Sequence, residues 1–427
     1  MKSFGIFFII LASFITINLW FISKQQLSDI TNDPYRSLSQ VLALLGIVFM
    51  AITLMLSTRL HRLEELFDGL DRMYLVHHIV GSVAFVFLLH HPLLLAIKSL
   101  PQFNLASLYI FPGNNLSYDL GIFGLYCMLF ATIFIVFIKL PYHIWKLSHK
   151  LMGLAFLLGS LHALFIPSDI SQNMILRIWV LIFIVLGLLS AFYIIFLYNT
   201  IGPKYIYCIK KIDQSTDIVN VYLMPIGRKL DFSPGQFIYI SFKNEFVGEE
   251  HHPFSLSSAP GAESIRISVK KLGDFTHKLP LLQENEKVHV YGPYGKFGDW
   301  YKKRRESLIL IAGGIGITPF LGMLKQNPPP LNKKITLFYC LRKRSEAVFL
   351  EEIKKNIENN PYINLHIWCS EESGRLNANK IRELLGEVNR NLIQVCGPPA
   401  MMESYKKQFM KQGISEKDIK LESFSQL

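Results

Sequence analysis

The chain has 427 residues, 51% of them hydrophobic, and a formal net charge of +12. This length predicts two or three domains, and the concentration of apolar residues in residues 1–200 excludes a wholly soluble protein. The positive charge lies in short loops and in the second half, without basic patches interleaved with aromatic residues, so we expect no nucleic-acid partner. Five scattered cysteines without a C-x-x-C pair argue against a disulfide framework or a zinc site.

Six apolar runs in the first half each approach the roughly 20 residues that a helix needs to cross a bilayer. They span residues 4–23, 37–57, 74–97, 119–138, 148–166 and 174–198. The first run is long for a signal-peptide core and lacks a small-x-small cleavage site, so we expect it to stay as a helix. Basic residues favour the side of the N-terminus and of the second and fourth loops, which predicts a multi-pass plasma-membrane protein with both termini cytoplasmic.

Histidines stand near both ends of two of these runs. They are His77, His78, His90 and His91 in the third run and His149 and His162 in the fifth. Histidine inside a membrane is costly and needs a partner or a function, and two axial histidines hold haem iron with no open position. His77 and His91 are 14 residues apart, and His149 and His162 are 13 residues apart. Along a helix axis both spacings correspond to a similar rise of roughly 20 Å. We therefore expect one histidine from each run at each of two depths, holding two stacked b-type haems.

The angular positions of these histidines fit less well. His77 and His91 lie ~40° apart around a regular helix, whereas His149 and His162 lie ~140° apart. This predicts an irregular fifth helix, with help from Gly153 or Gly159, or two haems rotated about the bundle axis. The two doublets also leave His78 and His90 as alternative ligands.

The second half has the pattern of a soluble protein. Alternating residues and Pro-Gly turns predict an antiparallel β-barrel domain over residues 201–303. From Ser307, strands alternate with helical segments, which predicts an α/β domain with a parallel sheet over residues 304–427. The first domain, residues 1–200, is the predicted six-helix transmembrane haem bundle.

The segment HHPFSLSSAP, residues 251–260, resembles the flavin motif of the ferredoxin-NADP-reductase superfamily. In that motif Phe254 lies against the isoalloxazine and the Ser255 hydroxyl reaches its N5 region. The other motif residues are His252, which stands where soluble relatives carry Arg, Pro253, and Ser257 and Ser258, which are suited to the ribityl or phosphate part. The resemblance implies FAD as a cofactor.

A turn that opens a helix follows at Gly273, Asp274 and Thr276. The free N–H groups of a helix N-terminus favour phosphate, and Arg266 and Lys270 are expected to add positive charge.

A glycine loop lies between a hydrophobic strand and a helix. Gly313, Gly314, Gly316, Thr318 and Pro319 form G-G-x-G-x-T-P, where the glycines allow a backbone to approach a pyrophosphate. This differs from G-x-G-x-x-G, so a Rossmann dehydrogenase is the poorer match.

Across residues 37–424 the chain resembles the NADPH oxidase and ferric-chelate reductase family, and we favour a bacterial-type NADPH oxidase within it. The third-run pattern H-x3-G-x9-H and the fifth-run pattern H-x12-H select four metal ligands. Topology pairs His77 with His149 as the inner haem and His91 with His162 as the outer one. Arg36 matches an arginine near the outer haem of family oxidases, although an interfacial side chain is an equal alternative.

The resemblance extends to the nicotinamide side. An Arg at position 342 meets the 2′-phosphate in relatives, which favours NADPH over NADH. Cys396, Gly397 and Pro398 resemble the C-G-P-x-x-M motif, where Cys396 shapes the hydride-transfer pocket or is a buried structural thiol. Phe424 is the candidate for the C-terminal aromatic residue that stacks on the flavin.

The expected activity is electron transfer from cytoplasmic NADPH through FAD and two haems to an acceptor outside. We favour oxygen, giving superoxide, over a ferric chelate because of Arg36 and the H-P-F-S motif. A haem anchor that passes electrons to a partner protein is a further alternative, but such anchors lack the nicotinamide half. No EF-hand pattern and no obligate protein partner are evident.

Overall fold

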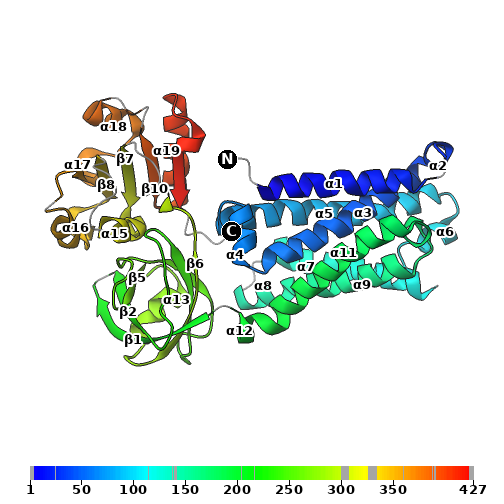
Figure 1. Ribbon diagram of the computed structural model, residues 1–427, viewed down its shortest axis with the longest axis horizontal. Coiled ribbons are helices and arrows are strands. Elements are labelled where there is room, and N and C mark those ends of the chain that lie inside the picture. Colours follow the sequence, from blue (N-terminus) through cyan, green and yellow to red (C-terminus); the bar gives the residue numbers. More distant parts are fainter. Residues whose placement is uncertain are drawn as a thin grey trace. The chain divides into compact units, whose positions relative to one another are not determined.

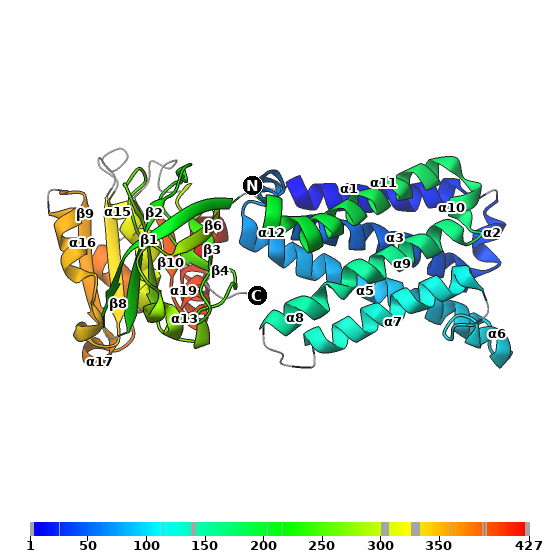
Figure 2. The same cartoon turned by 90° about the horizontal axis from the view of Figure 1, so that it is seen from below.

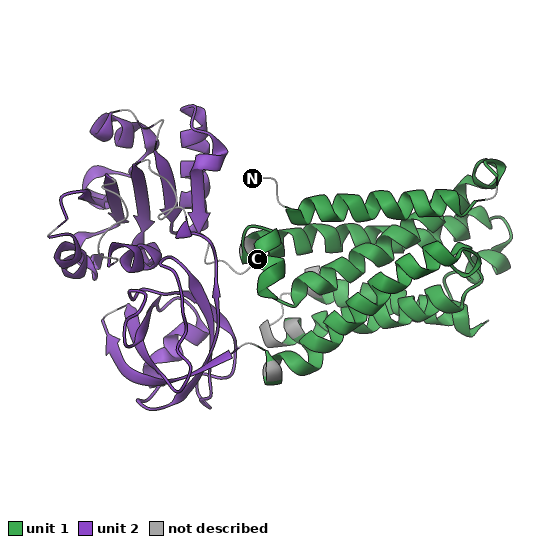
Figure 3. Cartoon of the chain, in the orientation of Figure 1, with its two compact units in different colours: residues 1–202 green, residues 203–427 purple. Residues whose placement is uncertain are grey.

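The computed structural model describes the chain except for residues 1–3, 25, 114, 137, 139–141, 203, 216, 300–306, 326–333, 359, 387, 389–390 and 423–427. The chain divides into two compact units, residues 1–202 and residues 203–427 (Figure 3). Each unit is described by itself.

The first unit contains six helical spans that are long and apolar enough to cross a membrane, counted over the described residues (Figures 1 and 2). The spans are α1 (Phe4–Ile22), α3 (Pro34–Ser57), α5 (Leu70–Lys98), α7 (Leu116–Val136), α8 with α9 (Tyr142–His149 and Leu151–Phe165), and α11 (Met174–Phe192) with the π-helix η1 (Tyr193–Leu197). Short helices connect or follow them: α2 (Ser28–Thr31), α4 (His61–Leu66), α6 (Phe103–Ser107), α10 (Asp169–Gln172) and α12 (Tyr198–Ile201). The predicted six-helix bundle is therefore confirmed.

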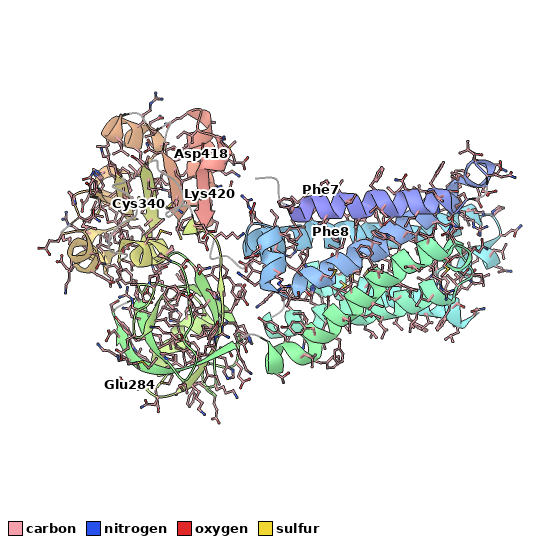
Figure 4. The ribbon with its side chains drawn as sticks, viewed as in Figure 1. Phe7, Phe8, Glu284, Cys340, Asp418 and Lys420 are labelled. Atoms are coloured by element: carbon pink, nitrogen blue, oxygen red, sulfur yellow. The ribbon has the colours of Figure 1, made fainter. Side chains whose placement is uncertain are left out.

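The bundle is organised around α3, which packs against α1, α5 and α11, while α7 packs against α9. Apolar side chains on the outside of the bundle are exposed, as a surface that faces lipid requires. Phe7 and Phe8 on α1 are examples, at 62% and 45% exposure (Figure 4).

The fifth span is irregular at Lys150, between α8 and α9. The Lys150 N–H donates to the Leu147 carbonyl at 3.1 Å, and the Gly153 N–H donates to the Lys150 carbonyl at 3.0 Å. Both bonds join residues three apart, as in a 3₁₀ turn, which tightens the helix and changes its angular phase. The irregularity expected from the histidine spacing is present, and it begins before Gly153.

The second unit begins with an antiparallel sheet of six strands in the order β4-β3-β6-β1-β2-β5. The strands are β1 (Lys204–Gln214), β2 (Ile218–Pro225), β3 (Phe237–Phe242), β4 (His252–Ser255), β5 (Ile265–Lys270) and β6 (Lys287–Tyr294). They wrap around a core of aliphatic side chains that includes Ile209, Val221 and Ile240. The helices α13 (Asp274–Lys278) and η2 (Leu279–Leu281) follow β5. This is the predicted, nearly closed β-barrel.

A five-stranded parallel sheet follows, in the order β11-β10-β7-β8-β9. Its strands are β7 (Leu308–Gly313), β8 (Ile335–Leu341), β9 (Ile363–Cys369), β10 (Leu392–Cys396) and β11 (Ile419–Glu422). Its helices are η3 (Gly314–Ile317), α15 (Thr318–Leu324), η5 (Arg344–Glu346), α16 (Leu350–Ile357), α17 (Ser370–Ser373), α18 (Ala378–Leu385), α19 (Pro399–Lys411) and η6 (Glu416–Asp418).

The parallel sheet is covered on both faces, because alternate residues of β7 point to opposite sides. Leu308 and Leu310 pack with Phe320 of α15, whereas Ile309 and Ile311 pack with Phe409 of α19. The predicted α/β fold with a parallel sheet is confirmed.

Candidate functional site

Four membrane histidines form two facing pairs. The ring centres of His77 and His149 lie 6.0 Å apart, and those of His91 and His162 lie 6.3 Å apart. Two imidazoles that bind one metal ion from opposite sides have ring centres roughly 6 Å apart, because a metal–nitrogen bond is about 2 Å long. Both pairs therefore fit axial ligation of a metal, as haem iron requires.

The second ring nitrogen of three of these histidines is held by the backbone. The Nδ1 atoms lie within hydrogen-bond distance of the carbonyls of Thr53 (3.0 Å from His77), Ser39 (3.1 Å from His91) and Ser117 (2.6 Å from His162). An Nδ1–H that donates to a carbonyl leaves Nε2 with its lone pair, which is the arrangement of metal-binding histidines. The His149 ring instead stacks on Trp145, with ring centres 5.5 Å apart.

Two small residues that were not predicted from the sequence lie directly against these rings. The Ser39 hydroxyl on α3 lies 2.8 Å from Nδ1 of His91, and a β-carbon at Gly121 on α7 would lie 2.8 Å from Nδ1 of His162. A hydroxyl and a glycine within apolar membrane runs are the signals that point to close helix contacts.

The neighbouring histidines are less enclosed than the pairs, although the His78 ring lies edge-on to the His77 ring with ring centres 5.8 Å apart. His78 and His90 are both exposed, and Nδ1 of His90 lies 2.7 Å from the Val86 carbonyl of its own helix. Arg36 is also exposed, in the first turn of α3 and three residues before Ser39. Its backbone N–H donates to the Asp33 carboxylate at 3.1 Å.

In the second unit, β4 carries the flavin motif from His252 to Ser255 and pairs with β3. The Ser255 hydroxyl is buried and has no hydrogen-bond partner among the described residues. An unsatisfied buried hydroxyl costs free energy, so an acceptor or donor from a bound group fits this position. Phe254 stacks on Phe275 with ring centres 6.4 Å apart.

His252 does not offer a strong positive charge to a pyrophosphate. Its ring packs 3.8 Å from that of Phe275, and Nε2 lies 2.8 Å from a Glu250 carboxylate oxygen. Burial lowers the pKa of His252, although the hydrogen bond to Glu250 opposes that shift.

The hydroxyls of Ser257 and Ser258 are already used inside the protein. Ser257 Oγ accepts from Nε of Arg266 at 2.9 Å and lies 2.9 Å from Ser268 Oγ, while Ser258 Oγ accepts from the Arg266 N–H at 3.0 Å. These contacts do not favour the ribityl or phosphate contacts expected from the sequence.

Arg266 likewise lies in a different environment from the one expected. It is only 7% exposed, and Nη1 and Nη2 donate to the Glu352 carboxylate of α16 at 2.9 and 2.8 Å. Lys325, at the end of α15, lies 2.5 Å from the same carboxylate and donates to the Ser257 carbonyl at 3.2 Å. We call Arg266, Lys325 and Glu352 the barrel–sheet cluster, because it joins β5 of the barrel to the helices of the parallel sheet.

The predicted phosphate turn closes on itself. Thr276 Oγ1 accepts from the N–H groups of Leu272 and Gly273 at 2.9 and 3.0 Å, which caps the short helix that Asp274 begins. Lys270 is the last residue of β5. The hydroxyl of Thr276 is thus committed to the turn.

The two nicotinamide motifs meet at the carboxyl ends of β7 and β10. A β-carbon at Gly316 would lie 2.2 Å from the Cys396 carbonyl oxygen, and one at Gly313 would lie 3.0 Å from Pro398. Gly397 packs against Gly313, and Gly314 has a φ of +53°. Thr318 and Pro319 start α15. Ligands of open parallel sheets bind at such strand ends.

Cys396 is fully buried at the end of β10. Burial raises the pKa of its thiol well above the usual value, so the thiol is neutral and unsuited to act as a nucleophile. Arg342, after β8, is exposed and pairs with Glu346 at 3.1 Å. Phe424 lies outside the described residues.

Three segments of the chain match known protein families. Residues 42–160 match the ferric reductase like transmembrane component, residues 208–298 an FAD-binding domain, and residues 310–407 an oxidoreductase NAD-binding domain.

The similar curated proteins align with about half of this chain. The probable dihydroorotate dehydrogenase B (NAD(+)) electron transfer subunit of Thermococcus kodakarensis is 31% identical over 46% of this chain and 78% of that protein. Flavohemoprotein A of Dictyostelium discoideum is 24% identical over 51% of this chain and 59% of that protein. The crystal structure of flavohemoglobin from Malassezia yamatoensis has a TM-score of 0.51 and 17% identity, covering 94% of this chain and 99% of that one, which shows similarity of fold alone.

The fold and these matches define a multi-pass membrane flavoprotein that is an NAD(P)H oxidoreductase. The chain belongs to the family in which a ferric-reductase transmembrane domain is fused to FAD- and NAD-binding domains, the architecture of ferric reductases and NADPH oxidases.

Proposed function

We propose that this protein carries electrons from cytoplasmic NADPH through FAD and two b-type haems to oxygen on the outer face, forming superoxide. The observation that carries the proposal is that two sets of imidazoles face each other across the bundle. The ring centres are 6.0 Å apart for His77 and His149 and 6.3 Å apart for His91 and His162. The cofactors supply the redox chemistry, since bound flavin divides a hydride into single electrons that haem iron can pass on. The protein supplies positions, ligands and separation from water.

The order of the two haem sites follows from the chain path. The pair His77 and His149 lies at the end of the bundle where α11 leads through α12 to residue 202. We therefore assign it as the inner site, which receives electrons first, and the pair His91 and His162 as the outer site. Loop charges support cytoplasmic termini and a plasma-membrane location.

The flavin is proposed to lie on β4, with Phe254 against the ring system and the Ser255 hydroxyl at its edge. Gly313, Gly314 and Gly316 are proposed to hold the pyrophosphate of NADPH beside Cys396 and Gly397. Phe424 keeps its proposed role as the aromatic residue that covers the flavin until the nicotinamide arrives.

Replacing Ser255 with alanine is expected to slow reduction of the flavin by NADPH about tenfold, the equivalent of one hydrogen bond. Stopped-flow absorbance of the purified protein measures this rate. Ser241→Ala is the matched control, because the buried Ser241 hydroxyl already donates to the Glu249 carbonyl. Equal rates for wild type and Ser255→Ala would remove Ser255 from the flavin site.

Replacing Arg342 with alanine is expected to raise KM for NADPH about tenfold and to leave KM for NADH unchanged, because a charge-assisted contact to the 2′-phosphate is lost. Steady-state kinetics with both nucleotides give the ratio. Arg382 on α18 provides an exposed arginine as control. An equal rise for NADH would show that Arg342 does not read the 2′-phosphate.

The acceptor is tested with purified protein supplied with NADPH, with and without a ferric chelate. We expect a signal from a superoxide trap that superoxide dismutase abolishes, without any requirement for the chelate. Arg36, close to the outer site along α3, supports an anionic product. The match to a ferric reductase domain makes ferric-chelate reduction the second candidate, and NADPH oxidation that requires the chelate would decide for it.

A further inference from the structure

A cavity of about 860 Å³ lies in the membrane unit, between the ends of α7, α8, α9 and α11. It is at the end of the bundle where α8 and α12 lie (Figure 2). Phe130, Leu147, Leu154, Leu189 and Phe192 are among its apolar walls. The π-helix η1 contributes Ile195 and Phe196, and π-helical turns are frequent at functional sites.

Polar groups in the lining are few. The Ser148 hydroxyl is satisfied by the Trp145 carbonyl at 2.8 Å. Lys150 also lines the cavity and is half-buried, and its side-chain ammonium group makes no hydrogen bond or ion pair within the part of the chain that the structure describes. The cavity therefore presents a large apolar space with one uncompensated positive charge.

The position of this charge identifies the kind of occupant. Within the fifth span, the part that is long and apolar enough to cross a membrane starts at Leu147, so Lys150 lies at the level where the hydrocarbon core meets the lipid headgroups. An acyl chain needs no hydrogen bonds in an apolar cavity, and the volume is within the range of roughly 300–1,000 Å³ for ligand sites. An anionic headgroup complements a basic side chain at this depth.

We propose that this cavity binds one anionic phospholipid, with an acyl chain between α7, α9 and α11 and the headgroup phosphate on Lys150. The site depends only on the membrane unit and not on the identity of the electron acceptor. It lies next to His149 in the chain, so the lipid packs against the span that supplies one histidine of the inner pair.

The test uses the full-length protein in nanodiscs of phosphatidylcholine mixed with phosphatidylglycerol, followed by native mass spectrometry of the lipids retained in detergent. Wild type is expected to retain phosphatidylglycerol in preference to phosphatidylcholine. Lys150→Gln is expected to lower the retained phosphatidylglycerol about fivefold, because one basic contact is lost. The control Arg177→Gln removes an exposed positive charge at the start of α11, the opposite end of that helix, and is expected to change nothing.

A second variant tests the acyl-chain part of the site. Leu189→Trp places an indole in the cavity and is expected to reduce retention of both lipids, with the haem and flavin absorbance of the sample unchanged. The proposal fails if Lys150→Gln retains as much phosphatidylglycerol as wild type, if Arg177→Gln loses as much, or if Leu189→Trp retains both lipids in full.

Discussion

Replacing His91 with leucine is expected to reduce the haem content of the purified protein from the proposed two per FAD to one. Loss of one axial imidazole leaves His162 without its partner, 6.3 Å away between ring centres, and a b-type haem is held only through its axial ligands and its pocket. The inner site keeps both ligands, so its low-spin spectrum should remain. His149→Leu is expected to remove the other haem and to stop electron transfer from flavin to the outer site.

The doublets in the third run provide matched controls for this prediction. His90→Leu and His78→Leu remove a histidine adjacent to each proposed ligand, and both side chains are exposed. They are expected to leave two haems per FAD, measured by the pyridine haemochrome assay against flavin fluorescence. If His90→Leu lost as much haem as His91→Leu, the ligand assignment would be wrong.

Replacing Glu352 with glutamine is expected to lower the free energy of unfolding of the second unit, residues 203–427, more than the other substitutions considered. The substitution leaves Arg266 and Lys325 as two largely buried cations without a counter-charge, and breaking a buried ion pair costs about 3–5 kcal/mol. Because the Glu352 side chain is 25% exposed, we expect the lower end, about 3 kcal/mol. NADPH should also reduce the flavin more slowly, since the barrel–sheet cluster aligns the two domains that hold the reactants.

The full-length protein in detergent serves for this measurement, with urea-induced release of flavin fluorescence as the signal. Glu351→Gln is the control, because Glu351 is the adjacent residue of α16 and, among the described residues, pairs with Lys354 alone in an exposed bridge at 2.8 Å. A stability of Glu352→Gln equal to that of Glu351→Gln would show that the cluster does not hold the domains together.

The same cluster predicts a pH dependence. Burial alone raises the pKa of the Glu352 carboxyl, but the hydrogen bonds and charges of Arg266 and Lys325 outweigh burial and hold that pKa below the usual 4.5. A lowered carboxyl pKa stabilises the folded state above about pH 4.5. This stabilisation is lost as the pH falls through the folded-state pKa, and in Glu352→Gln that part of the acid sensitivity should be absent.

Much of the fold was predictable because the sequence patterns that indicate it involve residues close together in the chain. Six apolar runs of membrane length predict the bundle, and alternating strands followed by strand–helix units predict the two soluble folds. The histidine pairing was predictable only in part, because helix geometry left His78 and His90 open, and their exposure depends on how α5 packs. The irregular fifth helix was expected from spacing, whereas its position at Lys150 required the backbone hydrogen bonds.

The flavin side shows where sequence reasoning reached its limit. Ser257, Ser258 and Arg266 look like phosphate contacts in a motif, but Glu352 lies 86 residues from Arg266 in the chain. No local pattern predicts that this distant carboxylate neutralises the arginine. The contact between Arg266 and Glu352 is made by tertiary packing, so it is seen in the three-dimensional structure and not in the sequence.

The vertical separation of the histidine pairs has a consequence for membrane energetics. The 14 residues from His77 to His91 rise roughly 21 Å along a helix, about two thirds of a ~30 Å hydrocarbon core. In the proposed orientation, each electron that travels between these levels moves charge across most of the membrane voltage. An interior-negative potential favours this movement by up to about 2.3 kcal/mol per 100 mV. Turnover is thus expected to depolarise the membrane and to slow as the voltage collapses, unless cations leave the cytoplasm at the same rate.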